Sequence, residues 1–147
     1  MTSEPGDLTS QADPRTASVA GVMTPAPVRI SLDDDLWTAL RIFLTTGLRH
    51  LVVVDVDNRC RGVLADRYVA AAWPGDAIGA RLTRVRQMMP DSAPLLAPET
   101  SISEAARAML TFGTDAIVVV DKEGRALGVV TGSDLIRSLA DGAEVRR

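Results

Sequence analysis

An internal duplication constrains the possible folds of this chain more than any other feature of its sequence. When residues 18–73 are placed on residues 84–139 at a constant offset of 66, the two segments align without a gap. Of the 56 aligned pairs 14 are identical, including the run 52–55 against 118–121, which is Val-Val-Val-Asp in both copies. A segment of this length buries so little apolar surface that it would be only marginally stable alone. The duplication therefore predicts one pseudo-symmetric unit of two repeats rather than two independent domains.

Each repeat is predicted to begin with a short strand followed by an amphipathic helix. The strands lie near residues 28–30 and 94–96. The helices carry apolar side chains at positions i, i+3, i+4, i+7 and i+8, the spacing of one helix face packed on a core. These positions are Leu36, Ala39, Leu40, Phe43 and Leu44 in repeat one and Ile102, Ala105, Ala106, Met109 and Leu110 in repeat two.

Signals at both ends of these helices support the prediction. Ser101 and Glu104 have the spacing of a capping box, and the acidic run 33–35 places negative charge at the equivalent start in repeat one. That role explains the three aspartates better than a metal site does. Gly47 and Gly113 stand where a C-terminal glycine ends a helix.

After each glycine the sequence predicts two further strands and a second helix. The β-branched runs 51–54 and 117–120 are typical of strands buried on both faces. Residues 55–58 and 121–124 have turn composition, and return strands follow near 62–64 and 127–130. A second helix begins near Asp66 and near Gly132. The predicted fold class is α/β (α+β), with two pseudo-symmetric β-α-β-β-α repeats.

The remaining residues are predicted to connect or flank the repeats. The polar segment 1–17 is expected to be a disordered tail, 74–83 a linker and 141–147 a short C-terminal tail, so that the repeats occupy 18–73 and 84–140. The N-terminus has no apolar region of the kind that a secretory signal contains. No apolar run approaches the roughly 18 residues of a membrane helix. We therefore expect a cytoplasmic protein that does not enter a membrane.

Composition excludes several kinds of site. Cys60 is the only cysteine and His50 the only histidine, which excludes an intramolecular disulfide and a zinc cluster of these residues. The net charge of −3 argues against nucleic-acid binding. Neighbouring arginines could activate Cys60, but an incidental thiol is the better interpretation. No nucleophile–base pair or phosphate-binding glycine loop is present, so the protein is not expected to be an enzyme.

The segment Gly128-Val129-Val130-Thr131-Gly132-Ser133-Asp134-Leu135 resembles the Gly-h-h-Thr-x-x-Asp-h signature (h, apolar) of the cystathionine-β-synthase (CBS) domain family. The segment 49–55, Arg-His-Leu-Val-Val-Val-Asp, resembles the strand entry of that family, and Met23-Thr24 and the element order agree with it. The resemblance covers residues 18–140 and implies a CBS-pair (Bateman) module. Many members of the family bind adenosine nucleotides in clefts between the repeats.

Physical chemistry and the resemblance suggest the same ligand-binding residues. Thr131–Asp134 lies at a predicted strand-to-helix junction, where backbone N–H groups favour an anion. The resemblance assigns the ribose to Thr131 and Asp134, with Gly132 and Ser133 at the helix N-terminus. It assigns the phosphates to Arg49 and His50. The alternative is that Thr131 or Asp134 only caps the helix and that His50 is a structural hydrogen-bonding group.

Comparison of the repeats predicts a single ligand site. At the offset of 66, Thr131 and Asp134 correspond to Ala65 and Tyr68, and the pair Arg49-His50 corresponds to Asp115-Ala116. One cleft is therefore expected to hold all the nucleotide-binding groups. The other would hold Ala65, Tyr68, Asp115 and Ala116, so replacing Asp115 is expected to change binding little.

The sequence thus predicts a stand-alone regulatory or sensor protein that requires no cofactor or metal. Its expected ligand is AMP, ADP, ATP or another adenosyl compound. The alternative is a ligand-free structural or protein-interaction module that scaffolds an unknown regulated protein. The resemblance also implies a homodimer. Trp37 lies outside the apolar stripe of its helix, where repeat two has Ser103, and is predicted to be an exposed contact residue.

Overall fold

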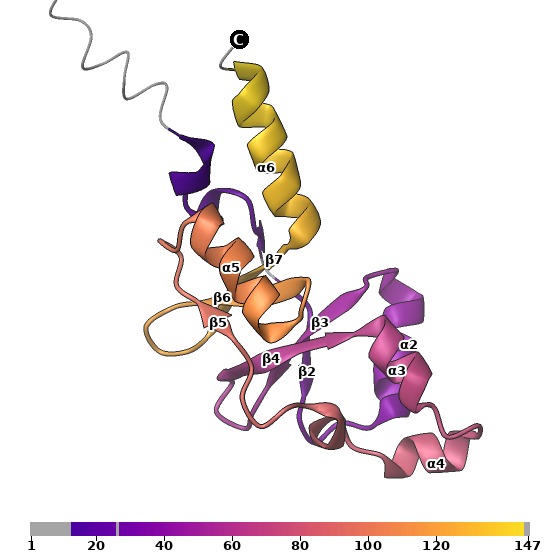
Figure 1. Ribbon diagram of the computed structural model, residues 1–147. Helices are drawn as coiled ribbons and strands as arrows, with labels where there is room; N and C mark the ends of the chain where they lie inside the picture. The colour runs from indigo at the N-terminus through magenta and orange to yellow at the C-terminus, as the bar shows by residue number, and fades with distance from the viewer. Residues whose placement is uncertain (1–12, 26, 146–147) are drawn as a thin grey trace, which may run out of the picture.

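The computed structural model describes residues 13–25 and 27–145, and it confirms a mixed α+β fold. The order of elements is η1 (Pro14–Thr16), η2 (Val19–Gly21), β1 (Thr24–Pro25), β2 (Arg29–Ser31), α2 (Leu36–Thr46), β3 (His50–Val54), β4 (Cys60–Ala65), α3 (Asp66–Ala72), α4 (Ala77–Leu82), η3 (Val85–Met88), β5 (Leu95–Leu96), α5 (Ile102–Phe112), β6 (Ala116–Val120), β7 (Ala126–Thr131) and α6 (Gly132–Val145). Figure 1 shows α2 and α3 beside one sheet with α4 beyond them, and α5 beside the other sheet, from which α6 projects.

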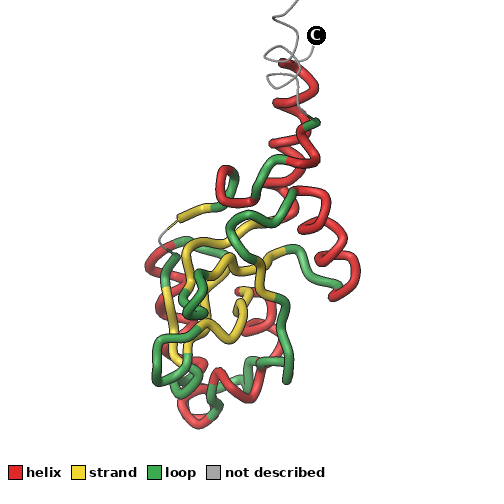
Figure 2. Tube along the Cα trace, turned by 90° about the vertical axis from the view of Figure 1, so that its left-hand side faces the viewer, coloured by secondary structure: helices red, strands yellow, loops and turns green. Residues whose placement is uncertain are grey.

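Each repeat contributes a small sheet with the predicted strand order. In the first sheet β3 lies between β2, which is parallel to it, and β4, which is antiparallel. In the second sheet β6 lies in the same way between β5 and β7, and β1 of repeat one adds a fourth strand on β7. The tube in Figure 2 shows strands inside and helices outside.

The apolar side chains form three clusters that together make up the core. One cluster joins the first sheet to its helices, and a second joins the second sheet to α5 and α6. A third lies between the two sheets and includes Val52, Val118 and Val129. The central strands β3 and β6 therefore face apolar neighbours on both sides, as their β-branched sequences predict.

Helix boundaries follow the predicted caps. Ser101 and Glu104 form the expected capping box, and Asp35 accepts a hydrogen bond from the Thr38 amide at the start of α2. Gly47 and Gly113 end α2 and α5 in the left-handed conformation, with φ of 71° and 64°. Such a backbone geometry favours glycine because a Cβ would crowd the chain.

The start of each repeat packs on the opposite repeat. Val19 lies in the cluster of the second sheet, and its amide donates to the Thr100 carbonyl at 2.8 Å. The equivalent Val85 lies in the cluster of the first sheet, and its amide donates to the Asp34 carbonyl at 2.8 Å. Both valines are fully buried. Neither repeat therefore completes its own core.

Two methionine–glycine contacts extend this exchange between the repeats. A Cβ at Gly128 would lie 2.7 Å from Met23 Sδ, and one at Gly62 would lie 2.9 Å from Met89 Cε. The glycines are thus required where a methionine from the other repeat crosses their strand. The four residues are two pairs at the offset of 66, so the exchange is pseudo-symmetric.

The predicted tails differ from the structure where the chain is described. Residues 1–12 lie outside the described residues, but residues 14–16 form η1, which is capped by Asp13 and packs beside α5 and α6. The expected polar tail after residue 140 is largely helical, since α6 continues to Val145. Within the expected linker 74–83, Asp76 caps the short helix α4.

The prediction that Trp37 is an exposed contact residue is wrong. Its side chain is partly buried against the first core cluster, and its ring centroid lies 6.3 Å from that of Trp73. The guanidinium carbon of Arg81 lies 5.4 Å from the centroid of the Trp37 ring. The linker helix α4, which the helical periodicity of α2 could not reveal, packs over this face of α2.

Candidate functional site

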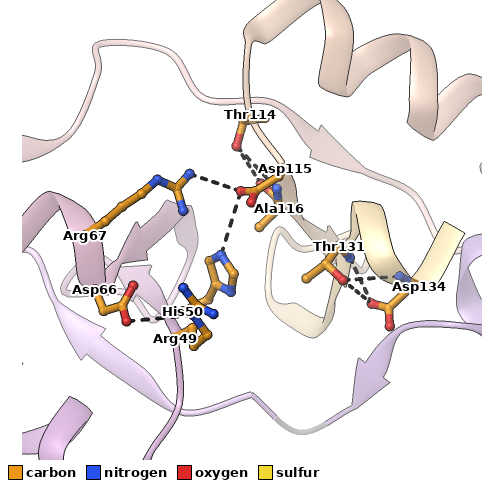
Figure 3. Close-up of polar contacts among 9 residues, drawn as sticks. All are labelled: Arg49, His50, Asp66, Arg67, Thr114, Asp115, Ala116, Thr131 and Asp134. Atoms are coloured by element: carbon orange, nitrogen blue, oxygen red, sulfur yellow. Dashed lines mark hydrogen bonds and ion pairs between the residues drawn. The ribbon is translucent and has the colours of Figure 1, made fainter. Parts of the chain in front are cut away.

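A polar cleft of about 560 Å³ lies where the two repeats meet. Repeat one contributes the entry to β3 and the start of α3, and repeat two contributes the entry to β6 and the start of α6 (Figure 3). The lining residues are Arg49, His50, Arg67, Asp115, Thr131, Gly132, Ser133 and Ile136. The cleft therefore brings together five of the six predicted ligand-binding residues; Asp134 lies directly behind Thr131.

The same backbone hydrogen bond sets the geometry on both sides of the cleft. The Asp66 amide at the start of α3 donates to the Arg49 carbonyl at 2.9 Å. The Gly132 amide at the start of α6 donates to the Asp115 carbonyl, also at 2.9 Å. Each bond ties a helix N-terminus to the entry of the adjacent central strand. Positions 49 and 115 thus occupy equivalent places, and their opposite charges meet in one cleft.

Thr131 and Asp134 form a reciprocal cap at the start of α6. Asp134 Oδ2 accepts from the Thr131 amide at 2.9 Å and from the Thr131 hydroxyl at 3.0 Å. The Asp134 amide donates to the Thr131 hydroxyl at 3.3 Å. Together with the Gly132 bond, this arrangement occupies three of the amides that were expected to be open to an anion. Asp134 Oδ1, which faces Arg137 at 3.4 Å, keeps acceptor capacity for a ligand.

Arg49 and His50 enter the cleft from the start of β3. The Arg49 side chain is 79% exposed, and its Nε lies 3.9 Å from Asp66 Oδ2. The His50 side chain is 19% exposed, and its Nε2 lies 3.9 Å from Asp115 Oδ1. Among the described residues, His50 Nε2 and Asp66 Oδ1 are buried atoms without a hydrogen-bond partner. Because both atoms are buried, a ligand group reaches them only if the side chains around them move.

Burial determines the charge of His50. Loss of solvent lowers the pKa of the imidazole, and the nearby guanidinium groups of Arg67 and Arg49 lower it further. The carboxylates of Asp115 and Asp66 act in the opposite direction but do not outweigh burial. His50 is therefore neutral at pH 7 and can donate or accept a single hydrogen bond at Nε2, depending on its tautomer.

Three residues that line this cleft, Arg67, Asp115 and Ile136, were not assigned to it by the sequence, and two of them are charged. Arg67 Nη2 donates to Asp115 Oδ1 at 3.1 Å. Burial raises the pKa of Asp115, but the hydrogen bond and charge of Arg67 outweigh burial and hold that pKa below its ordinary value. The exchange of Arg49 for an aspartate at the equivalent position was visible in the sequence. That Asp115 contacts Arg67 and faces His50 could be known only from the way the two repeats pack.

The predicted division into two separate clefts is therefore wrong in one respect. Of the residues assigned to the second cleft, Tyr68 lines a hollow of about 430 Å³ with Gly113 and Thr114. Asp115 instead faces His50 in the first cleft. The entries to β3 and β6 lie at the same edge of the molecule, so their side chains cannot be sorted into different clefts.

Other candidate sites are structural. Cys60 is buried, and burial raises the pKa of its thiol, which does not suit a reactive cysteine. Asp35 caps α2, Asp34 accepts from the Ser31 amide and Asp33 pairs with Arg86. Over residues 13–25 and 27–145, no group of three or more potential ligands is placed to hold a metal ion. Within the same ranges, no helix is long and apolar enough to span a membrane.

Comparisons with known proteins agree with this architecture. A family model of the CBS domain matches the chain twice, over residues 19–75 and 85–141. The chain is 28% identical over 127 residues to a CBS domain-containing protein of Dictyostelium discoideum, covering 80% of this chain and 88% of that protein. It is 30% identical over 121 residues to the magnesium transporter MgtE of Thermus thermophilus, covering 79% of this chain and 25% of the transporter.

Solved structures show the same fold. The cytosolic domain of the Mg²⁺ channel MgtE in complex with ATP matches with a TM-score of 0.70 and 28% identity, over 90% of this chain and 52% of that one. CBSX2 in complex with AMP matches with a TM-score of 0.71 and 21% identity, over 89% of this chain and 99% of that one. The expected pairing of two repeats in one module is confirmed.

Proposed function

The chain belongs to the CBS domain family, and from that premise we propose that it is a regulatory module that binds an adenosine-containing nucleotide in the cleft between its repeats. The observation that carries the proposal is the convergence of Arg49 and His50 with the start of α6 in one cleft. Residues from both repeats line this cleft, so a bound ligand would contact both. Binding can then shift the relative placement of the repeats if the ligand prefers one arrangement.

Each proposed contact follows from an atom that can still bond. The Asp134 carboxylate accepts from the ribose hydroxyls, and the Thr131 hydroxyl contributes beside it. Arg49 binds the phosphates beside the Ser133 amide, and His50 Nε2 joins them where the ligand displaces the side chains that bury it; Gly132 contributes contact only, since its amide already donates to Asp115. None of these groups has the arrangement of a nucleophile and its base, so the proposed role is binding without a chemical step.

The asymmetry of the repeats leads us to propose one nucleotide per chain. In repeat one, Ala65 caps α3 without a side-chain hydrogen bond, whereas Thr131 and Asp134 form a polar pair at the start of α6. Tyr68 stands where repeat two has Asp134 and offers no carboxylate to a ribose. Titration calorimetry should therefore give a stoichiometry near one. Two equivalent sites per chain would contradict this part of the proposal.

A ligand panel tests the proposal directly. Thermal unfolding is measured with adenosine, AMP, ADP, ATP, S-adenosylmethionine, NADH and cyclic di-AMP. A compound that binds the folded protein should raise its free energy of unfolding by about 2.7 kcal/mol when its concentration is a hundredfold above Kd. Arg49→Ala should weaken AMP and ATP far more than adenosine. Arg41→Ala is the matched control, because Arg41 is an exposed arginine on α2 outside the cleft. Equal weakening of all three ligands would contradict the phosphate role of Arg49.

A second candidate is a ligand-free module that scaffolds a regulated protein. Two observations favour it: the cap between Thr131 and Asp134, and the ion pair between Arg67 and Asp115, satisfy polar groups of the cleft without a ligand. Under this alternative no compound of the panel changes the unfolding temperature. Stabilisation by any adenosine compound, lost in Arg49→Ala or Asp134→Ala, would exclude it.

We also propose that the chain forms a homodimer through its helices. A groove of about 660 Å³ lies between α2 and α3, lined by residues such as Phe43 and Trp73. At its edge Leu44 is 74% exposed, and the equivalent Leu110 on α5 is 84% exposed. Because the duplication relates the two faces, a second copy can cover both in a closed pair. Leu44→Asp should shift a sedimenting dimer toward monomer, whereas Leu82→Asp on α4 should not; a wild-type monomer at micromolar concentration would contradict the proposal.

A further inference from the structure

The cleft contains a carboxylate where the sequence predicted only phosphate-binding cations. Asp115 accepts a hydrogen bond from Arg67 at 3.1 Å and faces His50 Nε2 at 3.9 Å (Figure 3). Its main chain is held in place, because its carbonyl accepts from the first amide of α6. The Asp115 carboxylate therefore stands between the basic side chains of repeat one and the helix start of repeat two. A ligand phosphate bound by His50 or Arg67 must approach this carboxylate closely.

The charges of the cleft are nearly balanced before any ligand binds. Arg67 faces Asp115, and Arg49 faces Asp66 at 3.9 Å. Burial keeps His50 neutral at pH 7. One phosphate can be accommodated by Arg49, whose side chain is 79% exposed and which, within the described part of the chain, pairs only with Asp66 at 3.9 Å. Each further phosphate adds negative charge beside Asp115 without finding another unpaired cation among the residues that line the cleft.

We propose that Asp115 is a specificity-determining residue that makes this cleft prefer adenosine ligands with no phosphate or one phosphate over those with three. The proposal rests on the nucleotide-binding function proposed above and defines the ligand class of the same cleft. Repulsion between like charges supplies the discrimination. The aspartate at position 115, where repeat one has Arg49, thus sets the charge that this cleft tolerates.

The exposure of the ion pair indicates that Asp115 is not required for the fold. The side chains of Asp115 and Arg67 are 62% and 48% exposed, and a pair this accessible to water contributes little to stability. Asp115→Asn keeps an oxygen that can accept from Arg67 and leaves the backbone bond to α6 unchanged. It removes one negative charge and little else, so it isolates the electrostatic effect.

The test compares the wild type with Asp115→Asn in calorimetric titrations of adenosine, AMP and ATP, and also of tripolyphosphate, which has no adenosine. In the variant, the affinity for ATP should rise about tenfold, as expected for removing one like charge at a distance of about 6 Å with an effective dielectric constant of about 40, between the values for water and for a protein surface. The affinity for adenosine should change less than about twofold, because a neutral ligand feels no such repulsion. Glu123→Gln is the control, since it removes one exposed negative charge from the turn at the opposite end of β6.

The outcomes separate this inference from the proposed function. If the wild type binds AMP and ATP equally and Asp115→Asn changes neither, the inference is overturned while nucleotide binding stands. If no adenosine compound binds either protein but tripolyphosphate binds Asp115→Asn and not the wild type, the specificity role stands and the proposed ligand class fails. If Glu123→Gln raises the affinity for ATP as much as Asp115→Asn does, net charge explains the effect and the inference is overturned. If nothing binds either protein, both proposals fail.

Discussion

Replacement of Asp134 by alanine should destabilise the protein even when no nucleotide is present. The carboxylate accepts from the Thr131 amide at 2.9 Å and from the Thr131 hydroxyl at 3.0 Å, and its side chain is only 12% exposed. Asp134→Ala removes both hydrogen bonds and leaves the partly buried amide of Thr131 without this partner. The carboxylate also faces Arg137 at 3.4 Å, but the Arg137 side chain is 68% exposed and that contact adds little.

The magnitude follows from the loss of a cap. Deleting a capping side chain costs about 0.5–2 kcal/mol, and a hydrogen bond to a charged group contributes about 1.5–3 kcal/mol. We expect the free energy of unfolding to fall by about 2 kcal/mol, because the two bonds share one acceptor atom and are not additive. For a chain of this size, each kcal/mol lowers the Tm by about 2–4 °C, so the expected decrease in Tm is about 4–8 °C.

Urea unfolding without ligand measures this loss. Asp134→Asn is the matched control: its amide oxygen can still accept from Thr131, so we expect it to lose about half as much stability as Asp134→Ala. A loss below about 0.5 kcal/mol for Asp134→Ala would refute the reasoning, because surface substitutions without structural consequence fall in that range. Such a result would mean that Asp134 is held for a ligand and not for the helix.

Three further predictions concern the exchanged core, the buried histidine and the tryptophan pair. Val19→Ala and Val85→Ala should each lower the free energy of unfolding by about 1.5–3 kcal/mol in urea titrations, since each fully buried valine completes the core of the opposite repeat; a loss confined to one of them would contradict the symmetric exchange. Burial lowers the pKa of His50 in the folded protein, so the unfolded chain binds a proton at this residue more readily than the folded chain does. The free energy of unfolding is therefore unaffected by the titration of His50 above pH 6.5, the ordinary pKa of histidine, and decreases as the pH falls below that value. His50→Gln should remove that part of the acid-induced loss, and an unchanged pH profile would argue against the buried neutral ring. Trp37→Ala should lower the free energy of unfolding by about 2–4 kcal/mol and weaken the near-ultraviolet circular dichroism signal expected from the Trp37–Trp73 pair, whereas an exposed residue would leave both unchanged.

Local signals in the sequence were sufficient to predict the elements of the fold. Each signal lies within a few residues of the helix end or strand that it predicts. These signals are the capping box at Ser101, the glycines that end α2 and α5, and the β-branched runs of β3 and β6. These signals act through backbone conformation and through periodicity, which depend on near neighbours in the chain. For the same reason the sequence also indicated the cap at the start of α6, as one of two interpretations of Thr131 and Asp134.

Periodicity could not predict contacts between elements that are distant in the chain. Trp37 lies off the apolar stripe of its helix, yet α4 and Trp73 cover it, because the linker folds back over α2. The start of each repeat likewise lies on the opposite core, although alignment placed it with its own repeat. A duplication reveals which residues are equivalent, but it does not reveal which copy each one packs against.

At the candidate site, the sequence determined the residue types and the tertiary structure determined which of them are in contact. The sequence by itself determined the chemistry at each position: a cation and an imidazole before one central strand, an aspartate before the other, and a threonine–aspartate cap on one helix only. The tertiary structure alone decided that Asp115 faces His50 and Arg67 in the same cleft. The reason is geometric, since the pseudo-symmetric packing of the two sheets brings the entries of β3 and β6 to one edge. His50 and Arg67, which precede Asp115 by 65 and 48 positions in the chain, then lie 3.9 Å and 3.1 Å from its carboxylate.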